Sequence, residues 1–168
     1  TEQRMIREVY TGVMAVPNRS LKPWLARLTN DNAQGEYYLT DIVKLAVADG
    51  VDVVAAKVAD RVQVDGVNSP VQLAELERAY QLRLARTLMD QGVRLADPTR
   101  FDVRGELLCG QDVEIDVNCV FEGSVSLGQG VRVGANCFVA NAIIADGAVI
   151  HPFTHIDGEK AGVHVGEG

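Results

Sequence analysis

The chain has 168 residues, of which 47% are hydrophobic and 23% charged, a composition typical of a soluble globular protein rather than a disordered one. Its net charge of −7 argues against a general nucleic-acid-binding surface. No stretch approaches the roughly 18 apolar residues of a membrane span, and no signal peptide is visible.

Strand-like and helix-like segments alternate in the first part of the chain. Residues 9–16 (VYTGVMAV) are expected to form a short strand around a glycine, and residues 51–58 (VDVVAAKV) are a second β-rich run. This alternation indicates an α/β layer. The segment is too short for a complete doubly wound domain, so we interpret it as the last part of one.

Two helices are expected between these runs. Residues 21–28 should form an amphipathic helix with Pro23 near its first turn. Thr40 or Asp41 can cap the next helix, which should end at Gly50. A polar, aromatic loop, NDNAQGEYY, lies between the two helices.

A longer helix follows, and we interpret it as an arm that carries the α/β part away from the rest of the chain. One face mixes Glu and Arg and is expected to be solvated. The other face carries an apolar stripe of Leu73, Leu76, Tyr80, Leu84 and Leu88.

The last third of the chain is a six-residue repeat. From Val103 onward the sequence can be written as eleven consecutive hexapeptides. The first position is apolar in nine of them, and so is the fifth position. Neither a helix nor a hairpin has this period, since their side chains recur every 3.6 and 2 residues. The pattern predicts a parallel β-helix of about 18-residue coils, with the first and fifth positions pointing inward. Gly134 and Gly147 suit its corners.

The cysteines show no CxxC pair and no metal-ligand spacing, which favours reduced, buried thiols. Cys119 and Cys137 are one predicted coil apart and should stack in the core; the third is Cys109. The apolar columns are interrupted by His151, His155 and Asp157. A histidine in an inward column is expected to be satisfied in the core or to lie at a subunit contact.

Four stretches of the sequence carry a family resemblance. They are REVYTGV, LTNDNAQGEYYLTDIV, VDGVNSPVQLAELERAYQ and DPTRFDVRGELLCGQDVEIDVNCVFEGSVSLG. Together they resemble the bifunctional bacterial N-acetylglucosamine-1-phosphate uridyltransferase / glucosamine-1-phosphate N-acetyltransferase. The resemblance covers essentially the whole chain.

The resemblance implies a fold of three parts. Residues 1–70 would be the end of a Rossmann-like uridyltransferase domain, residues 71–102 a linker helix arm, and residues 103–168 the start of a left-handed parallel β-helix. It also implies a cytoplasmic homotrimer held through the β-helix.

The family acetylates glucosamine-1-phosphate with acetyl-CoA and then joins the product to UTP with Mg²⁺. The resulting UDP-N-acetylglucosamine serves peptidoglycan and lipopolysaccharide synthesis, and thereby cell shape. The implied partners are therefore a sugar phosphate and a sugar nucleotide, with no nucleic acid.

The resemblance also assigns residues. Asn68 matches the family position that holds Mg²⁺ and the sugar nucleotide, while Tyr38 and Thr40 match positions at the GlcNAc moiety. From the residues alone, Asn68 can equally be a turn asparagine, Tyr38 a packing residue and Thr40 a helix cap. Tyr10 stands where the family carries Asn, so it should face the sugar but contact it differently.

No catalytic residue is assigned within the chain. The family's glycine-rich loop and metal-binding aspartate are expected before Thr1, and the acetyltransferase histidine after Gly168, so His151, His155 and His164 receive no catalytic role. The chain alone is expected to be inactive. Two rivals stay open: a single-function sugar-phosphate nucleotidyltransferase with a structural solenoid, and a non-catalytic trimerising scaffold.

Overall fold

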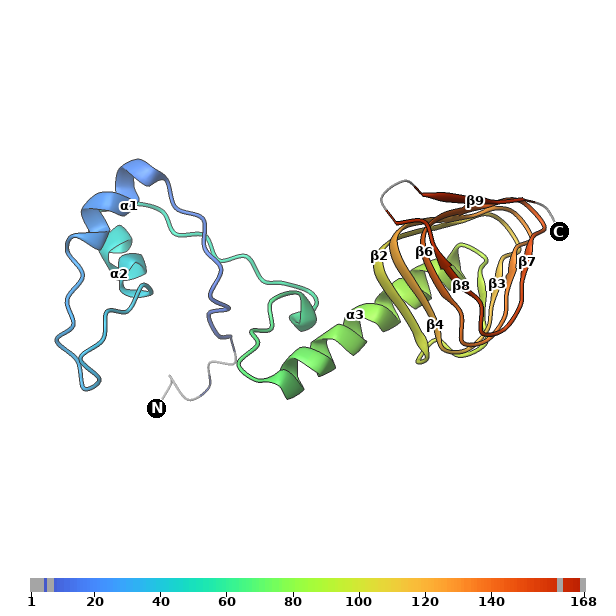
Figure 1. Ribbon diagram of the computed structural model, residues 1–168. Coiled ribbons are helices and arrows are strands. Elements are labelled where there is room, and N and C mark those ends of the chain that lie inside the picture. The colour runs from blue at the N-terminus through green and yellow to red at the C-terminus, as the bar shows by residue number, and fades with distance from the viewer. Residues whose placement is uncertain (1–4, 6–7, 160–161, 167–168) are drawn as a thin grey trace. The chain divides into compact units, whose positions relative to one another are not determined.

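The computed structural model describes residues 5, 8–159 and 162–166. The chain divides into two compact units, Thr1–Gly66 and Val67–Gly168, which are described separately (Figure 1). No described helix is long and apolar enough to cross a membrane.

The first unit is built on two short helices. They are α1 (Asn18–Leu25) and α2 (Asp41–Ala48), and a 3₁₀ turn, η2 (Arg61–Gln63), follows. Its core consists of Trp24, Ile42 and Ala46. The indole N–H of Trp24 donates to Asp49 at 2.7 Å, so a polar bond at the end of α2 also joins the two helices.

Helix α2 is where the sequence predicted it, whereas α1 spans Asn18–Leu25 instead of the predicted residues 21–28, and the caps of both helices differ from expectation. Pro23 lies well inside α1, which begins at Asn18, so the expected first-turn position is wrong. Thr40 precedes α2 without a side-chain cap, because its own backbone is already helical (φ −59°, ψ −23°). The stop at Gly50 is confirmed: its φ is +70°, and Val51 N–H donates to the Ala46 carbonyl at 2.9 Å.

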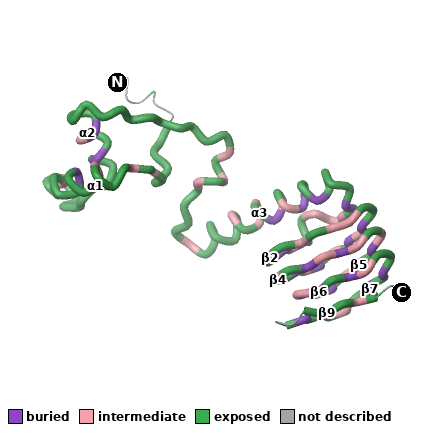
Figure 2. Tube along the Cα trace, turned by 90° about the horizontal axis from the view of Figure 1, so that it is seen from above, coloured by how far each residue is buried: buried purple, intermediate pink, exposed green. Residues whose placement is uncertain are grey.

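The two expected strands of this unit are wrong. Residues 9–16 and 51–58 form no strand, although both are β-rich. A strand is stabilised by its ladder to a neighbour, and neither segment has a strand neighbour among the described residues. Figure 2 shows most of both segments as exposed.

The second unit is a helix followed by a parallel solenoid. Helix α3 (Pro70–Asp90) starts with Ser69, whose hydroxyl accepts from Gln72 N–H at 3.2 Å. One sheet has the order β1-β3-β5-β7, and the other has β2-β4-β6-β8 with β9 also beside β6. The strands are β1 (Arg94–Leu95), β2 (Phe101–Cys109), β3 (Glu114–Ile115), β4 (Cys119–Leu127), β5 (Arg132–Val133), β6 (Phe138–Ile144), β7 (Val149–Ile150), β8 (His155–Asp157) and β9 (Val163–Val165).

The register confirms the predicted solenoid of hexapeptide repeats. Phe101 pairs with Cys119 and Val120 with Phe138, each a step of one 18-residue coil. Cys119 and Cys137 are both buried at equivalent positions of successive coils, as expected. Gly147 has φ +69°, which favours glycine, and a Cβ on Gly134 would lie 2.7 Å from the Pro152 nitrogen, so the structure agrees with glycine at both corners.

The repeat frame slips by one residue within β6. Glu122 pairs with Ala140 but Val125 pairs with Ala142, so the step to the next coil shortens from 18 to 17 residues here, and β5 and β7 keep the shorter step. The predicted inward positions Ile143 and Val149 are therefore wrong: they are 49% and 52% exposed, whereas Ala142 and Ala148 are buried. Two further expected inward positions, Ala161 and Glu167, lie outside the described residues.

The same slip explains why polar residues occur at positions that the six-residue columns placed inward. His151, His155 and Asp157 are all exposed, so the inward column does not extend to them and the histidines are not satisfied in the core. The alternative place for the histidines, at a subunit contact, stays a prediction. Ile150 takes an inward place instead. The His155 ring stacks on Phe138 with centroids 4.7 Å apart.

Helix α3 packs on the core of the second unit through part of the predicted apolar stripe and through residues outside it. Leu88 is buried in that core and Leu84 packs against it, as the stripe predicted. Leu73 and Tyr80 are 57% and 49% exposed, so the prediction is wrong for these two stripe residues, while Gln81, outside the stripe, is buried. The Gln81 amide accepts from Val103 N–H at 2.9 Å and donates to the Val103 carbonyl at 2.8 Å. It therefore satisfies the backbone of Val103 in β2, the first strand of its sheet.

Arg78 reinforces this contact one turn earlier along the helix. Its guanidinium pairs with the Asp102 carboxylate at 2.7 Å and donates to the carbonyls of Thr99 and Phe101 at 3.2 Å each. The face of α3 that was expected to be only solvated thus also attaches the helix to the solenoid.

Candidate functional site

The polar loop between α1 and α2 is shaped by the side chain of Asn32. Its Oδ1 accepts from the N–H groups of Gln34 at 3.1 Å and Glu36 at 3.2 Å. Its Nδ2 donates to the Glu36 carbonyl at 2.6 Å. Gly35, with φ +67°, makes the turn possible. The sequence analysis did not single out Asn32, although an Asn two residues before a polar residue and a glycine is a turn signal.

Tyr38 lies at the end of this loop and is half-buried. Its hydroxyl donates to Gln34 Oε1 at 3.0 Å. The neighbouring Tyr37 is 65% exposed and makes no hydrogen bond with another described residue. The two adjacent tyrosines are therefore in different environments, and only Tyr38 is held by a polar partner.

Tyr10 and Thr40, also in the first unit, both expose their side chains to solvent. Tyr10 is 48% exposed. Neither side chain hydrogen-bonds to another described residue, so their polar atoms are available to a ligand.

Asn68 lies in the second unit, two residues before α3. Its N–H donates to Gln72 Oε1 at 2.8 Å, while its exposed side-chain amide bonds to no described residue. An exposed amide oxygen fits the role of one protein ligand for Mg²⁺, which takes its other oxygens from water and phosphate. The described residues contain no group of three His, Cys, Asp or Glu placed to hold a metal ion.

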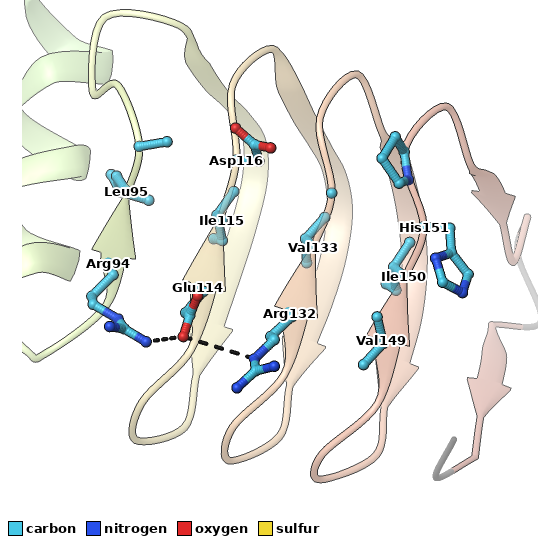
Figure 3. Close-up of a pocket in the computed structure, with 13 residues that line it drawn as sticks. Arg94, Leu95, Glu114, Ile115, Asp116, Arg132, Val133, Val149, Ile150 and His151 are labelled. Carbon is cyan, nitrogen blue, oxygen red and sulfur yellow. Dashed lines mark ion pairs between the residues drawn. The ribbon is translucent and has the colours of Figure 1, made fainter.

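A hollow of about 390 Å³ lies along the sheet formed by β1, β3, β5 and β7 (Figure 3). The Glu114 carboxylate lies between Arg94 and Arg132 and forms an ion pair with each, at 3.8 Å for Arg132. The two cations are thus already paired with a carboxylate. None of the residues predicted to bind substrate lines this hollow.

The cysteines are poor candidates for nucleophiles. Burial raises the pKa of Cys109 and of Cys119 to about 11, so both are neutral thiols near neutral pH. The Cys119 thiol lies 3.2 Å from the Gly134 carbonyl, to which it donates. These thiols belong to the core and not to a reactive centre.

Comparison with known proteins identifies the family. The chain is 71% identical, over 99% of its length, to the "Bifunctional protein GlmU" of Paracidovorax citrulli (strain AAC00-1). It is 76% identical over 99% of its length to the protein of the same name from Polaromonas naphthalenivorans (strain CJ2). The chain belongs to the GlmU family. No family model matches it.

The family assignment confirms the resemblance that the sequence motifs indicated. Similarity extends to the GlmU of Cupriavidus pinatubonensis (strain JMP 134 / LMG 1197), which is 57% identical over 95% of this chain. The chain spans 37% of the length of the Paracidovorax relative and 35% of the Polaromonas relative.

Proposed function

We propose that the protein carrying this chain makes UDP-N-acetylglucosamine. It acetylates glucosamine-1-phosphate with acetyl-CoA and then transfers UMP from UTP to the N-acetylated product. The observation that carries the proposal is the 71–76% identity to proteins named bifunctional over 99% of the chain. The product would supply peptidoglycan and lipopolysaccharide synthesis in the cytoplasm.

The proposal assigns sugar binding to the first unit. Tyr38 and Thr40, which match family positions at the GlcNAc moiety, contact the N-acetylhexosamine. A tyrosine suits this contact because it offers both a flat apolar face and a hydroxyl to a sugar ring. Tyr10 faces the same sugar in place of the family asparagine. The solvent-accessible side chains of Tyr10 and Thr40 support this assignment.

Uridyl transfer depends mainly on positioning and on neutralising the phosphates, for which Mg²⁺ supplies positive charge. Asn68 would hold that ion through its amide oxygen. Its unpaired, exposed side chain supports this role.

The solenoid would belong to the acetyltransferase part and assemble the protein as a homotrimer. By function, residues 1–70 would belong to the uridyltransferase, 71–102 to the arm and 103–168 to the acetyltransferase. The structural division differs, because α3 packs on the solenoid and β1 precedes residue 103.

The proposal is tested by pyrophosphate release from UTP and N-acetylglucosamine-1-phosphate with Mg²⁺, using the native-length protein. Replacing Asn68 by Ala should reduce release by roughly 100-fold or more, as for other groups that stabilise a transition state electrostatically. Gln72→Ala, which removes only the acceptor of the Asn68 N–H, is the matched control and should retain most activity. Release that is equal in wild type and Asn68→Ala would remove Asn68 from the site, and no release would contradict the uridyltransferase.

A further inference from the structure

The bond between Gln34 and Tyr38 restricts what the Tyr38 hydroxyl can do. A phenolic hydroxyl has one proton to donate and can accept through its oxygen. In the structure that proton is directed at Gln34 Oε1, 3.0 Å away. The lone pairs of the tyrosine oxygen are left for another partner, which must be a donor.

Asn32 fixes this arrangement from the other side of the loop. Through one side chain it holds the N–H of Gln34 and both the N–H and the carbonyl of Glu36. Gln34 is therefore anchored at its backbone two residues after Asn32 and bonded at its side chain to Tyr38. Because the loop is exposed, these bonds contribute more to the loop's geometry than to overall stability.

We propose that Asn32 and Gln34 are positioning residues that set Tyr38 as a hydrogen-bond acceptor for the sugar. This inference rests on the proposed function. It deepens that function by assigning the chemistry of the contact: Tyr38 accepts a hydrogen bond from a sugar hydroxyl or from the acetamido N–H. Neither Asn32 nor Gln34 needs to touch the substrate.

The direction of the Gln34 bond can be tested with two replacements. Gln34→Glu keeps an acceptor for the Tyr38 hydroxyl and removes the amide donor, whereas Gln34→Met has a similar length and no good acceptor. We expect Gln34→Met to raise KM for N-acetylglucosamine-1-phosphate by about 3- to 10-fold, as for one hydrogen bond, with kcat and KM for UTP little changed. Gln34→Glu should stay within about 2-fold of wild type at an ionic strength that screens its added charge.

A double-mutant cycle separates positioning from general damage to the loop. In a Tyr38→Phe background, Gln34→Met should have no further effect on KM, because the hydroxyl it orients is absent. Tyr37→Phe is the matched control, since Tyr37 is exposed and unbonded, and should leave KM unchanged. Asn32→Ala should raise the same KM as Gln34→Met does.

Each outcome decides the inference. Loss of sugar-phosphate affinity in Gln34→Glu, or additive effects of Gln34→Met and Tyr38→Phe, would overturn it. Wild-type release of pyrophosphate together with unchanged KM in Gln34→Met would overturn this inference and leave the uridyltransferase standing. Absence of release in wild type would count against the proposed function itself.

Discussion

The two units of the chain are stabilised in different ways. In the second unit each coil pairs with the next in register, and inward side chains form a continuous buried column from Phe101 to Ile150. In the first unit three buried side chains hold two short helices, while its β-rich segments stay unpaired. A solenoid is thus specified by neighbours one coil away, whereas the first unit depends on one small core and a few polar contacts.

The largest expected effect tests where the core column of the solenoid runs. Ile144→Ala should lower the free energy of unfolding by about 2–5 kcal/mol, because Ile144 is 1% exposed. The adjacent Ile143→Ala should cost less than about 1 kcal/mol, since Ile143 is 49% exposed. Urea denaturation followed by circular dichroism measures both. Equal costs, or a larger cost at Ile143, would contradict the 17-residue coil.

The next effect concerns the contact between α3 and the first coil. Gln81→Ala removes the partners of the Val103 N–H and carbonyl and should destabilise the second unit by about 1–3 kcal/mol. Hydrogen exchange of the Val103 amide should accelerate with it. The control is Leu73→Ala on the same helix, which should cost less than about 0.5 kcal/mol because Leu73 is exposed. A costlier Leu73→Ala would show that Leu73 packs as the apolar stripe predicted.

The solenoid should be sensitive to alkaline pH. Burial raises the pKa of Cys119 from 9.0 to about 11, so the folded state keeps its thiol proton where the unfolded state loses it. Stability should be constant below pH 9.0 and fall as pH rises towards about 11, by roughly 2 kcal/mol for this group. Cys119→Val should reduce the fall by that amount in urea midpoints measured from pH 8 to 11. An identical pH profile in Cys119→Val would contradict the prediction.

The smallest effect is in the first unit, where stability should fall as the pH is lowered rather than raised. The Trp24 indole and then the Arg27 guanidinium hold the pKa of Asp49 below its usual 3.8. Their stabilisation is present above pH 3.8 and should be lost as the pH falls through the lowered value. The Trp24 indole N–H resonance should shift with this titration in an NMR series, and Asp49→Asn should abolish the shift. A Trp24 resonance that titrates unchanged in Asp49→Asn would show that another group causes it.

Much of the fold was predictable because short sequence patterns encode it. The six-residue columns predicted the solenoid and the stacking of Cys119 and Cys137, and Gly50 marked the end of α2. The frame slip was not visible, because Ala142 and Ala148 are apolar, as are Ile143 and Val149, so both frames place apolar residues inward.

Other features depend on distant partners and could not be predicted from local pattern. Gln81 is buried only because the backbone of Val103 lies opposite it, 22 residues further along the chain. The β-rich runs needed a neighbouring strand to become strands. Resemblance alone pointed to Tyr38 and Asn68 as binding residues, whereas the roles proposed for Asn32 and Gln34 rest on hydrogen bonds that only the structure shows.

The measurement that tests the central proposal most directly is a single reaction with the native-length protein, glucosamine-1-phosphate, acetyl-CoA, UTP and Mg²⁺. Free CoA, pyrophosphate and the sugar nucleotide would be quantified together. The proposal predicts equal amounts of CoA and pyrophosphate, no pyrophosphate when acetyl-CoA is omitted, and UDP-N-acetylglucosamine as the product. Pyrophosphate release with glucosamine-1-phosphate or glucose-1-phosphate and no CoA would contradict it and indicate a single-function nucleotidyltransferase.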